Sequence, residues 1–350
     1  MEIELLPAEY GDAIVIRTKA DGNPFTIVID GGPRGTVKKV SKYYEELGHI
    51  DLMILTHFDE DHIAGILEYA KLFSDKSMPV DRFWCNCAQN IDFNTTTDVS
   101  DTGFENANTL ASYLRKQKLL NPAFEWREEI KTGMRFEKGN LKIAIISPSQ
   151  EILTTLKSDY NDYILRHPQI DEENESTDIA SFRVDLDAKK TIDDLAEKDT
   201  PRNVNLWNKA SIAFLLSAEG KQILMTGDAD ADVMAAGIEA LPDLILPLHL
   251  DLTKVSHHGS KNNISYRLLS HIRCQRFAFT TNGGTRNWYH PDRKTLAIIL
   301  KGANRAASEQ VDFYFNYPVN SIQKRTGVLL SEEEQKRHNC KFLEKYSIEL

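Results

Sequence analysis

Residues 52–62 run Leu52-Met53-Ile54-Leu55-Thr56-His57-Phe58-Asp59-Glu60-Asp61-His62. The four apolar residues at the start are typical of a buried strand. Two imidazoles and three carboxylates follow that strand within six positions, from His57 to His62. Imidazole and carboxylate together suit Zn²⁺ or Mn²⁺. The segment therefore predicts a strand that delivers His57, Asp59, Asp61 and His62 to a metal site. The alternative is a charged loop before a helix, with Asp59 as its capping residue.

Two later segments repeat this pattern of an apolar strand followed by a ligand-type residue. The run 222–226 leads into Gly227-Asp228, and the run 252–256 leads into His257-His258-Gly259-Ser260. In α/β sheets, sites assemble in the loops at the carboxyl ends of strands. We therefore expect the three loops to converge if their strands lie side by side. Taken alone, Gly227-Asp228 would be an ordinary turn.

The composition indicates a folded cytoplasmic protein. Of its 350 residues, 41% are hydrophobic, which is enough for one large α/β unit or two fused half-domains. The chain has no apolar run of membrane-spanning length, and its start lacks the pattern of a secretory signal. Four cysteines, Cys85, Cys87, Cys274 and Cys340, show no spacing that indicates a disulfide or a zinc knuckle. We expect reduced thiols and no contact with a membrane.

The net charge of -10 argues against a protein that grips many phosphates over its surface. Much of the acidity lies between Gln169 and Thr200, whereas basic residues gather between Lys254 and Arg293. An anionic substrate, either a small molecule or a nucleic acid or nucleotide held at one focused site, fits this distribution. A protein partner and self-association are left open.

Apolar and turn patterns predict the elements between these loops. We expect strands over residues 3–6, 13–18, 25–30, 52–56, 141–147, 211–216, 222–226, 252–256, 276–281 and 311–315. We expect helices over 40–47, 63–73, 106–119, 229–241 and 293–303. The acidic span of about 150–205 is interpreted as an insertion over the surface of one domain that covers residues 1–310. Residues 311–350 are interpreted as a strand and helix extension packed on that domain.

These residues resemble the metallo-β-lactamase superfamily, whose pattern is His-x-His-x-Asp-His after a strand, a distant His, a Gly-Asp pair and a last His. Asp59 at the second position, Gly227-Asp228 and His257-His258-Gly259-Ser260 are similar to the ComEC-like hydrolase branch. The further matches are Gly11-Asp12-Ala13, Asp30-Gly31-Gly32, Asn208-x-x-Ser211 and His290-Pro291. Together they span roughly residues 1 to 300.

The resemblance implies an αββα sandwich of two mixed β-sheets with the metal site at one edge. It implies that His57 and Asp59 bind one ion, that Asp61 and His62 bind the other, and that Asp228 bridges both. His257 or His258 would complete the shell of the second ion; we favour His257 as the ligand and His258 as a substrate contact. His290 would stabilise a leaving group, and Asp30 would support the ligand loops.

The chain departs from the family in two ways. Asp59 stands where most members carry histidine, which makes the first metal position harder and favours Mn²⁺ as an alternative to Zn²⁺. The third histidine is missing, because the only histidine between His62 and Asp228 is His167 in the acidic span. Asn208, or else Asn205, stands near that place, and an amide oxygen would hold the first ion weakly.

The resemblance implies a hydrolase in which one or two divalent ions activate water, with phosphodiesters as the favoured substrates. Asp61 and Asp228 would orient the hydroxide, and Lys254, Ser260, His258 and His290 would contact an anionic group or the leaving group. The alternatives are hydrolysis of a small ester, lactone or thioester, and a binding module or effector that is not catalytic or is gated by a partner.

Overall fold

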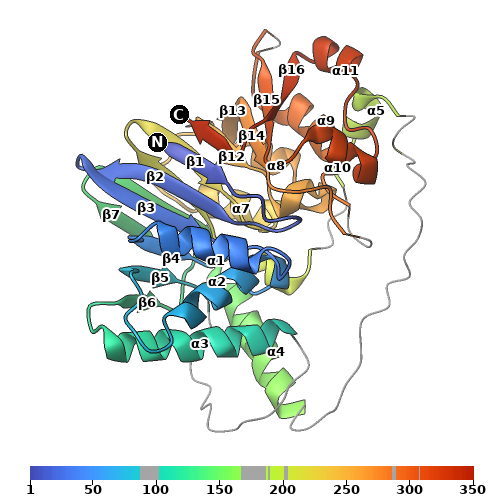
Figure 1. Cartoon of the computed structure of the whole chain (residues 1–350). Helices are drawn as coiled ribbons and strands as arrows, with labels where there is room; N and C mark the ends of the chain where they lie inside the picture. Colours follow the sequence, from blue (N-terminus) through green and yellow to red (C-terminus); the bar gives the residue numbers. More distant parts are fainter. Residues whose placement is uncertain (87–101, 167–186, 188–189, 201–203, 286–288, 307) are drawn as a thin grey trace.

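The computed structural model describes residues 1–86, 102–166, 187, 190–200, 204–285, 289–306 and 308–350. In these residues, two mixed β-sheets pack face to face and helices cover both outer faces (Figure 1). The predicted αββα sandwich is confirmed. Cys87, His167 and the acidic run of residues 171–175 lie outside the described residues.

The first sheet has seven strands in the order β17-β1-β2-β3-β4-β5-β6. The pairs β17–β1, β1–β2 and β2–β3 are antiparallel, and β3, β4, β5 and β6 run parallel to one another. The bounds are β1 Glu2–Leu5, β2 Ile14–Ala20, β3 Asn23–Ile29, β4 Leu52–Ile54, β5 Arg82–Trp84, β6 Glu125–Arg127 and β17 Ser347–Glu349.

The second sheet has eight strands in the order β16-β15-β14-β12-β10-β9-β8-β7, and β11 and β13 form a separate pair. Five neighbouring strands of this sheet run parallel to one another, namely β10, β12, β14, β15 and β16. The bounds are β7 Arg135–Lys138, β8 Leu141–Ser147, β9 Ala213–Ala218, β10 Lys221–Met225, β11 Leu248–Leu250, β12 Leu252–Lys254, β13 Ile272–Cys274, β14 Arg276–Phe279, β15 Val311–Phe315 and β16 Cys340–Glu344.

Helices flank the sheets, with α1, α2 and α3 against the first sheet and α7, α8 and α9 against the second (Figure 1). The helix bounds are α1 Val37–Glu46, α2 Glu60–Leu72, α3 Thr102–Leu120, α4 Gln150–Arg166, α5 Ile192–Ala196, α6 Leu206–Lys209, α7 Ala231–Glu239, α8 Tyr266–Ser270, α9 Arg293–Gly302, α10 Val319–Thr326 and α11 Glu332–Arg337. Two 3₁₀ turns, His257–Gly259 and Lys261–Asn263, follow β12. Within the described residues, none of the helices has both the length and the apolar character needed to cross a membrane.

The central core lies between the sheets, where alternate strand residues from both sides meet. Ile16 and Phe25 of the first sheet and Phe214 and Ile223 of the second are buried in one cluster. The opposite faces of the strands pack on the helices, as Met53 packs with the apolar side of α2. Because both faces of the parallel strands are covered, their sequences are continuous apolar runs and do not alternate between apolar and polar residues.

The predicted insertion of about 150–205 contains described residues that pack into the core, and its status as an insertion stays a prediction. Leu153 and Leu156 of α4 are buried, and Ile192 and Leu195 of α5 belong to the core beneath α9. Helical spacing of apolar residues at these positions is what buries them. The segment 311–350 supplies β15 and β16 to the second sheet and β17 to the first. Its separation at residue 310 stays a prediction.

Candidate metal centre

The three ligand-bearing loops meet at one edge of the sandwich, around the carboxylate of Asp228. The loop after β4 comes from the first sheet, and those after β10 and β12 come from the second. Four imidazoles point their Nε2 atoms at Oδ2 of Asp228. The distances are 3.4 Å from His62, 3.7 Å from His257, and 3.9 Å from both His57 and His258. The predicted convergence is therefore present in the structure.

Several of these atoms are buried without a hydrogen-bond partner. Among the described residues, they include Nε2 of His57, His62 and His258 and Oδ1 of Asp228. Burying polar atoms without partners is costly, and native proteins rarely do it. The site nitrogens and carboxylates also gather closely, since ligand atoms of His57, His62 and Asp228 lie within 4.8 Å of one another. This donor set fits divalent cations, which would satisfy the unpartnered atoms.

Hydrogen bonds on the far side of each ring fix its orientation. His62 Nδ1 lies 2.8 Å from Oδ2 of Asp30, and His258 Nδ1 lies 2.8 Å from the carbonyl of Thr280. Asp30 also accepts from the backbone N–H and the hydroxyl of Thr56, both at 2.7 Å. These bonds hold each ring with Nδ1 toward its oxygen partner and Nε2 toward the centre, where Nε2 could bind a metal once its proton is displaced. Asp30 is fully buried and supports the ligand loops, as expected from the sequence.

The remaining ligand candidates fall on two sides of Asp228. Asp61 Oδ2 lies 3.3 Å from His258 Nε2 and 3.9 Å from His62 Nε2. Asp59 Oδ2 lies 3.4 Å from His57 Nε2. Asp59 occupies the residue before α2, but its side chain makes no capping hydrogen bond. The alternative interpretation is thus confirmed for the position of Asp59 at the N-cap of α2, but no capping bond occupies its carboxylate.

The charges of the site balance one another. Burial would raise the pKa of Asp228, but the imidazoles of His62, His257 and His258 hold it well below its usual value. Burial would lower the pKa of His62, and the carboxylates of Asp228, Asp61 and Asp30 raise it well above its usual value instead. Burial lowers the pKa of His257 to about 4, against the pull of Asp228. His257 is therefore neutral near pH 7, whereas His62 carries a proton.

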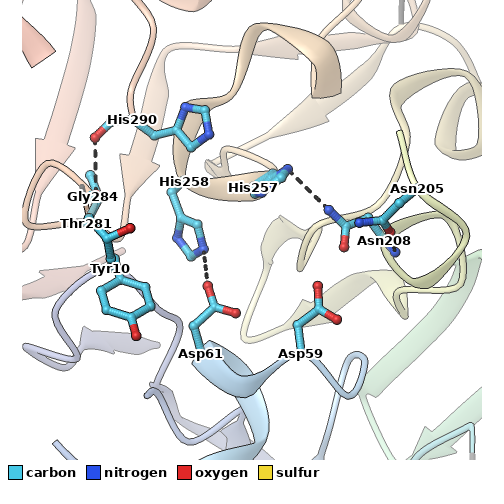
Figure 2. A pocket seen from close by; sticks show the side chains of 11 residues that line it. Tyr10, Asp59, Asp61, Asn205, Asn208, His257, His258, Thr281, Gly284 and His290 are labelled. Carbon is cyan, nitrogen blue, oxygen red and sulfur yellow. Dashed lines mark hydrogen bonds and ion pairs between the residues drawn. The ribbon is translucent and has the colours of Figure 1, made fainter. Parts of the chain in front are cut away.

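A pocket of about 380 Å³ opens onto this centre (Figure 2). Six predicted site residues line it, namely Asp59, Asp61, Asn208, His257, His258 and His290. The ring of His290 lies 5.3 Å from the ring of His257, and its Nδ1 lies 3.4 Å from Asp292. Tyr10 and Asn205 also line the pocket. The pocket thus places polar side chains on the open side of the metal ligands.

Two predicted substrate contacts, Lys254 and Ser260, are not among the residues that line this pocket. Lys254 is only 1% exposed; its ammonium pairs with Asp12, lies 3.9 Å from Oδ1 of Asp228 and donates to the Gly227 carbonyl at 3.1 Å. A buried ammonium needs such partners, so Lys254 faces inward rather than toward the pocket. Ser260 is buried, and its hydroxyl accepts from the N–H of Asn262.

Several basic residues after Lys254 form ion pairs within the protein, so fewer of them are free to bind an anionic substrate than their number suggests. Arg267 pairs with Glu239, Arg273 with Glu309 and Arg293 with Glu334. Three arginines of the expected basic neighbourhood are therefore paired with carboxylates, and the part this neighbourhood plays in binding an anion stays a prediction. Acidic partners far away in the sequence neutralise them, which local composition does not reveal.

Sequence reasoning missed the residues that position the ligands. Asn263 reaches both the Asp228 carbonyl, at 2.9 Å, and Nδ1 of His257, at 3.1 Å. Thr280 accepts from His258 and donates to Asp12. Tyr10 donates to Glu60 at 3.1 Å. The position of Tyr10 beside Gly11-Asp12 was the one available indication, whereas Asn263 and Thr280 stand in no motif.

Comparison with known proteins supports the broader resemblance. Residues 6–139 match the family model described as the metallo-beta-lactamase superfamily. The match includes His57 to His62 and ends before Asp228, so it covers less than half of the chain. It supports placing the chain in that superfamily. The comparison with curated proteins found no match.

The chain is also similar to several solved structures. YhfI from Bacillus subtilis, a metallo-beta-lactamase fold protein, is 11% identical, with 99% of each chain covered and a TM-score of 0.39. Zn²⁺-bound PqqB from Methylobacterium extorquens is 12% identical, with both chains covered in full and a TM-score of 0.41. CmlA, a diiron β-hydroxylase from Streptomyces venezuelae, is 10% identical, with 85% of this chain and 49% of that chain covered and a TM-score of 0.40.

Proposed function

We propose that this protein is a metal-dependent hydrolase that cleaves phosphodiesters. The observation that carries the proposal is the set of four imidazole Nε2 atoms within 3.9 Å of one carboxylate oxygen of Asp228. Three of these nitrogens are buried without a hydrogen-bond partner in the described part of the chain. A purely structural polar cluster would satisfy its nitrogens internally.

His57, Asp59, Asp61, His62 and Asp228 would hold one or two divalent ions together with the adjacent histidines His257 and His258. When bound, such ions supply a water of lowered pKa and a positive charge next to the scissile bond. Zn²⁺ suits the imidazoles, and Mn²⁺ is the alternative because of the three carboxylates. The donor set alone does not choose between them.

The remaining roles, which are to orient the water, protonate the leaving group and position the ligands, fall to side chains of the protein. Asp61 and Asp228 accept hydrogen bonds and so orient the attacking water. His290 lies on the pocket wall beside His257, where its imidazole can donate a proton to the leaving oxygen. Tyr10 lines the same pocket, and the hydrogen bond from its hydroxyl to Glu60 holds its ring there against the substrate. Asp30, Asn263 and Thr280 keep the histidines in place.

The choice of a phosphodiester rests on the ComEC-like order of motifs and on a donor set rich in carboxylates. A second candidate is a small ester, lactone or thioester. It is favoured by the ion pairs that neutralise Arg267, Arg273 and Arg293, because paired arginines are not free to hold a nucleic acid backbone.

Paired assays test the proposal. Protein loaded with Zn²⁺ or Mn²⁺ is given bis-nitrophenyl phosphate, a cyclic nucleotide, single-stranded DNA, RNA and a lactone. We expect phosphodiester cleavage that falls at least about 100-fold in Asp228→Ala, the upper end of the loss seen when only an outer-shell partner is removed. His249→Ala removes an exposed histidine on β11 and serves as the matched control.

Three results would count against the proposal. Lactone hydrolysis without phosphodiester cleavage would favour the second candidate. Equal activity of wild type and Asp228→Ala would assign the cleavage to a contaminant. Fewer than one bound ion per chain after loading would favour a binding module or a hydrolase gated by a partner.

A further inference from the structure

We infer that residues 316–325, the segment that follows β15, position one wall of the substrate pocket. Three side chains of this segment, those of Asn316, Tyr317 and Arg325, hydrogen-bond to two loops that line the pocket. The inference rests on the proposed function, because it concerns the pocket that would receive the substrate. It assigns no metal ligand and makes these three side chains positioning residues for substrate binding.

One side of the pocket is built from two loops that belong to different sheets. Tyr10 comes from the loop between β1 and β2, and Thr281 and Gly284 come from the loop after β14. Figure 2 shows these three residues together on one side of the pocket, across from Asn205 and Asn208. We call Tyr10, Thr281 and Gly284 the pocket wall. None of the three is a proposed metal ligand, so the wall would contact the substrate rather than an ion.

Glu9 joins the two loops through its backbone. Its carbonyl accepts from the N–H of Asn282 at 2.8 Å, and its own N–H donates to the hydroxyl of Tyr317 at 2.8 Å. Glu9 is left-handed, with φ of 53°. Residues other than glycine rarely adopt this conformation and keep it only where the surroundings fix it. The bond to Tyr317 therefore helps to fix the backbone from which Tyr10, the next residue, enters the pocket.

Asn316 connects the same two loops through its side-chain amide. Its Oδ1 accepts from the N–H of Thr281 at 3.0 Å, and its Nδ2 donates to the carbonyl of Leu6 at 2.9 Å. An amide side chain can accept and donate at the same time, so one residue fixes both loops. The hydroxyl of Thr281 donates to the carbonyl of His290 at 3.2 Å. Asn316 thus also supports the backbone of the residue proposed to protonate the leaving group.

Arg325 of α10 holds the outer end of the wall. Its Nη1 donates to the Gly284 carbonyl and, at 3.3 Å, to Oδ1 of Asn282. Gly283 and Gly284 have φ of 102° and 93°, a region that favours glycine. A Cβ atom on Gly283 would lie 3.0 Å from the carbonyl oxygen of Ile322 in α10. The two glycines therefore let this loop turn tightly against α10.

These contacts should act on substrate binding. A loop that is already ordered loses little conformational entropy when a ligand binds to it. Freeing the loops should therefore weaken binding of the substrate and of the transition state alike. Such a loss raises KM and leaves kcat unchanged. A segment that served only the overall fold would instead change stability, metal content and turnover together.

Tyr317→Phe tests the inference, because it removes one oxygen atom and keeps the ring. Metal-loaded wild type and variant are assayed with whichever substrate of the panel above is cleaved. We expect KM to rise about 2–10-fold, which is what the loss of one typical hydrogen bond produces, with kcat and bound metal unchanged. Tyr346→Phe makes the same chemical change at an exposed tyrosine and should match wild type.

Asn316→Ala extends the test to the other loop. KM should rise, and kcat should fall as well, because Thr281 also holds the backbone of His290. Asn320→Ala removes an exposed asparagine of α10 and serves as the matched control, with neither constant changed.

Hydrogen exchange tests the positioning without turnover. In Tyr317→Phe the Glu9 N–H loses its acceptor, so amides of residues 8–12 and 281–284 should exchange faster while the rest of the chain keeps its wild-type rates. Unchanged exchange at these residues, or an unchanged KM, would overturn the inference. Faster exchange throughout the chain, or a loss of bound metal, would assign Tyr317 to the general fold and refute it too. A chain that cleaves none of the substrates would refute the proposed function, and exchange would still decide the positioning.

Discussion

At the scale of single residues, Asp228 determines the electrostatics of the centre. Its carboxylate is 2% exposed, and the imidazoles around it lower its pKa. Burial would lower the pKa of His258, but Asp228 and Asp12 raise it. Without a metal, protons on His62 and His258 therefore balance the buried carboxylates. A metal must displace those protons, because histidine binds metals in its neutral form.

This exchange predicts proton release when metal binds. We expect protons to be released from His62 and His258, whose pKa values are raised, and none at pH 7 from His257, whose pKa is about 4. Because the pKa values of the two proton donors are raised, metal affinity should rise with pH through neutrality. Calorimetry in buffers of different ionisation enthalpy measures the released protons. Affinity that is constant between pH 6 and 8 would contradict the prediction.

Some residues of the candidate site could be predicted from the sequence, and others could not. His57, Asp61, His62 and Asp228 were predictable because each follows an apolar strand within a few residues. The burial of the Lys254 side chain could not be predicted, because its partner Asp12 lies in a loop of the other sheet. Likewise, the approach of both His257 and His258 to Asp228 depends on two left-handed φ angles that residue identity does not specify.

At the scale of elements, the position of α2 depends on a close approach between two glycines. The loop after β3 meets α2 where the Gly31 N–H donates to the His62 carbonyl at 2.6 Å. A Cβ atom on Gly65 would lie 2.0 Å from the Gly31 carbonyl oxygen. Only glycine lets the helix come this near. Because α2 begins with Glu60 and contains Asp61 and His62, its distance from the loop sets the position of two ligands.

Gly65→Ala should therefore destabilise the protein by about 1–3 kcal/mol, the typical cost of overpacking. Helix propensity alone would give the opposite sign, a gain of about 1 kcal/mol. Zn²⁺ affinity should fall as well, because α2 must shift outward. Urea unfolding and zinc titration measure both effects. Lys71→Ala, at an exposed position of the same helix, should change stability by less than about 0.5 kcal/mol, and a stabilised Gly65→Ala protein would disprove the close approach.

Elements were predictable where their patterns were long. The helix expected over 106–119 lies inside α3, and the strand expected over 141–147 matches β8. The three-residue strands β5, β6, β11, β13 and β17 were not predicted, because so short a run carries no periodicity. The equally short β4 and β12 were predicted because each lies in a longer apolar run that leads into a histidine motif. β4 ends at Ile54 rather than residue 56, since the N–H of Thr56 bonds to the side chain of Asp30 instead of a neighbouring strand.

At the scale of the whole molecule, the centre joins the two sheets. His57, Asp59, Asp61 and His62 follow a strand of the first sheet, and Asp228, His257 and His258 follow strands of the second. The buried pair of Asp12 and Lys254 makes a second link between the same sheets. Ions bound at this edge would therefore connect parts of the chain that are far apart in sequence.

Metal removal should lower global stability. An ion that binds only the folded chain adds about 2.7 kcal/mol when its free concentration is a hundred times Kd. We expect chelation to reduce the Tm of wild type and to leave that of Asp228→Ala unchanged. Calorimetric scans with and without a chelator measure the difference. A wild-type Tm that does not respond to chelation would show that the ions contribute nothing to holding the sheets together.

The pairing of β17 with β1 has a consequence for synthesis. Glu2 lies opposite Glu349 in an antiparallel ladder, so β1 gains its outer neighbour only after residues 347–349 have left the ribosome. The ligands of the first sheet emerge long before Asp228, His257 and His258. A nascent chain thus exposes half of the proposed metal centre until His258 has emerged, beside a strand edge that stays unpaired until residues 347–349 follow.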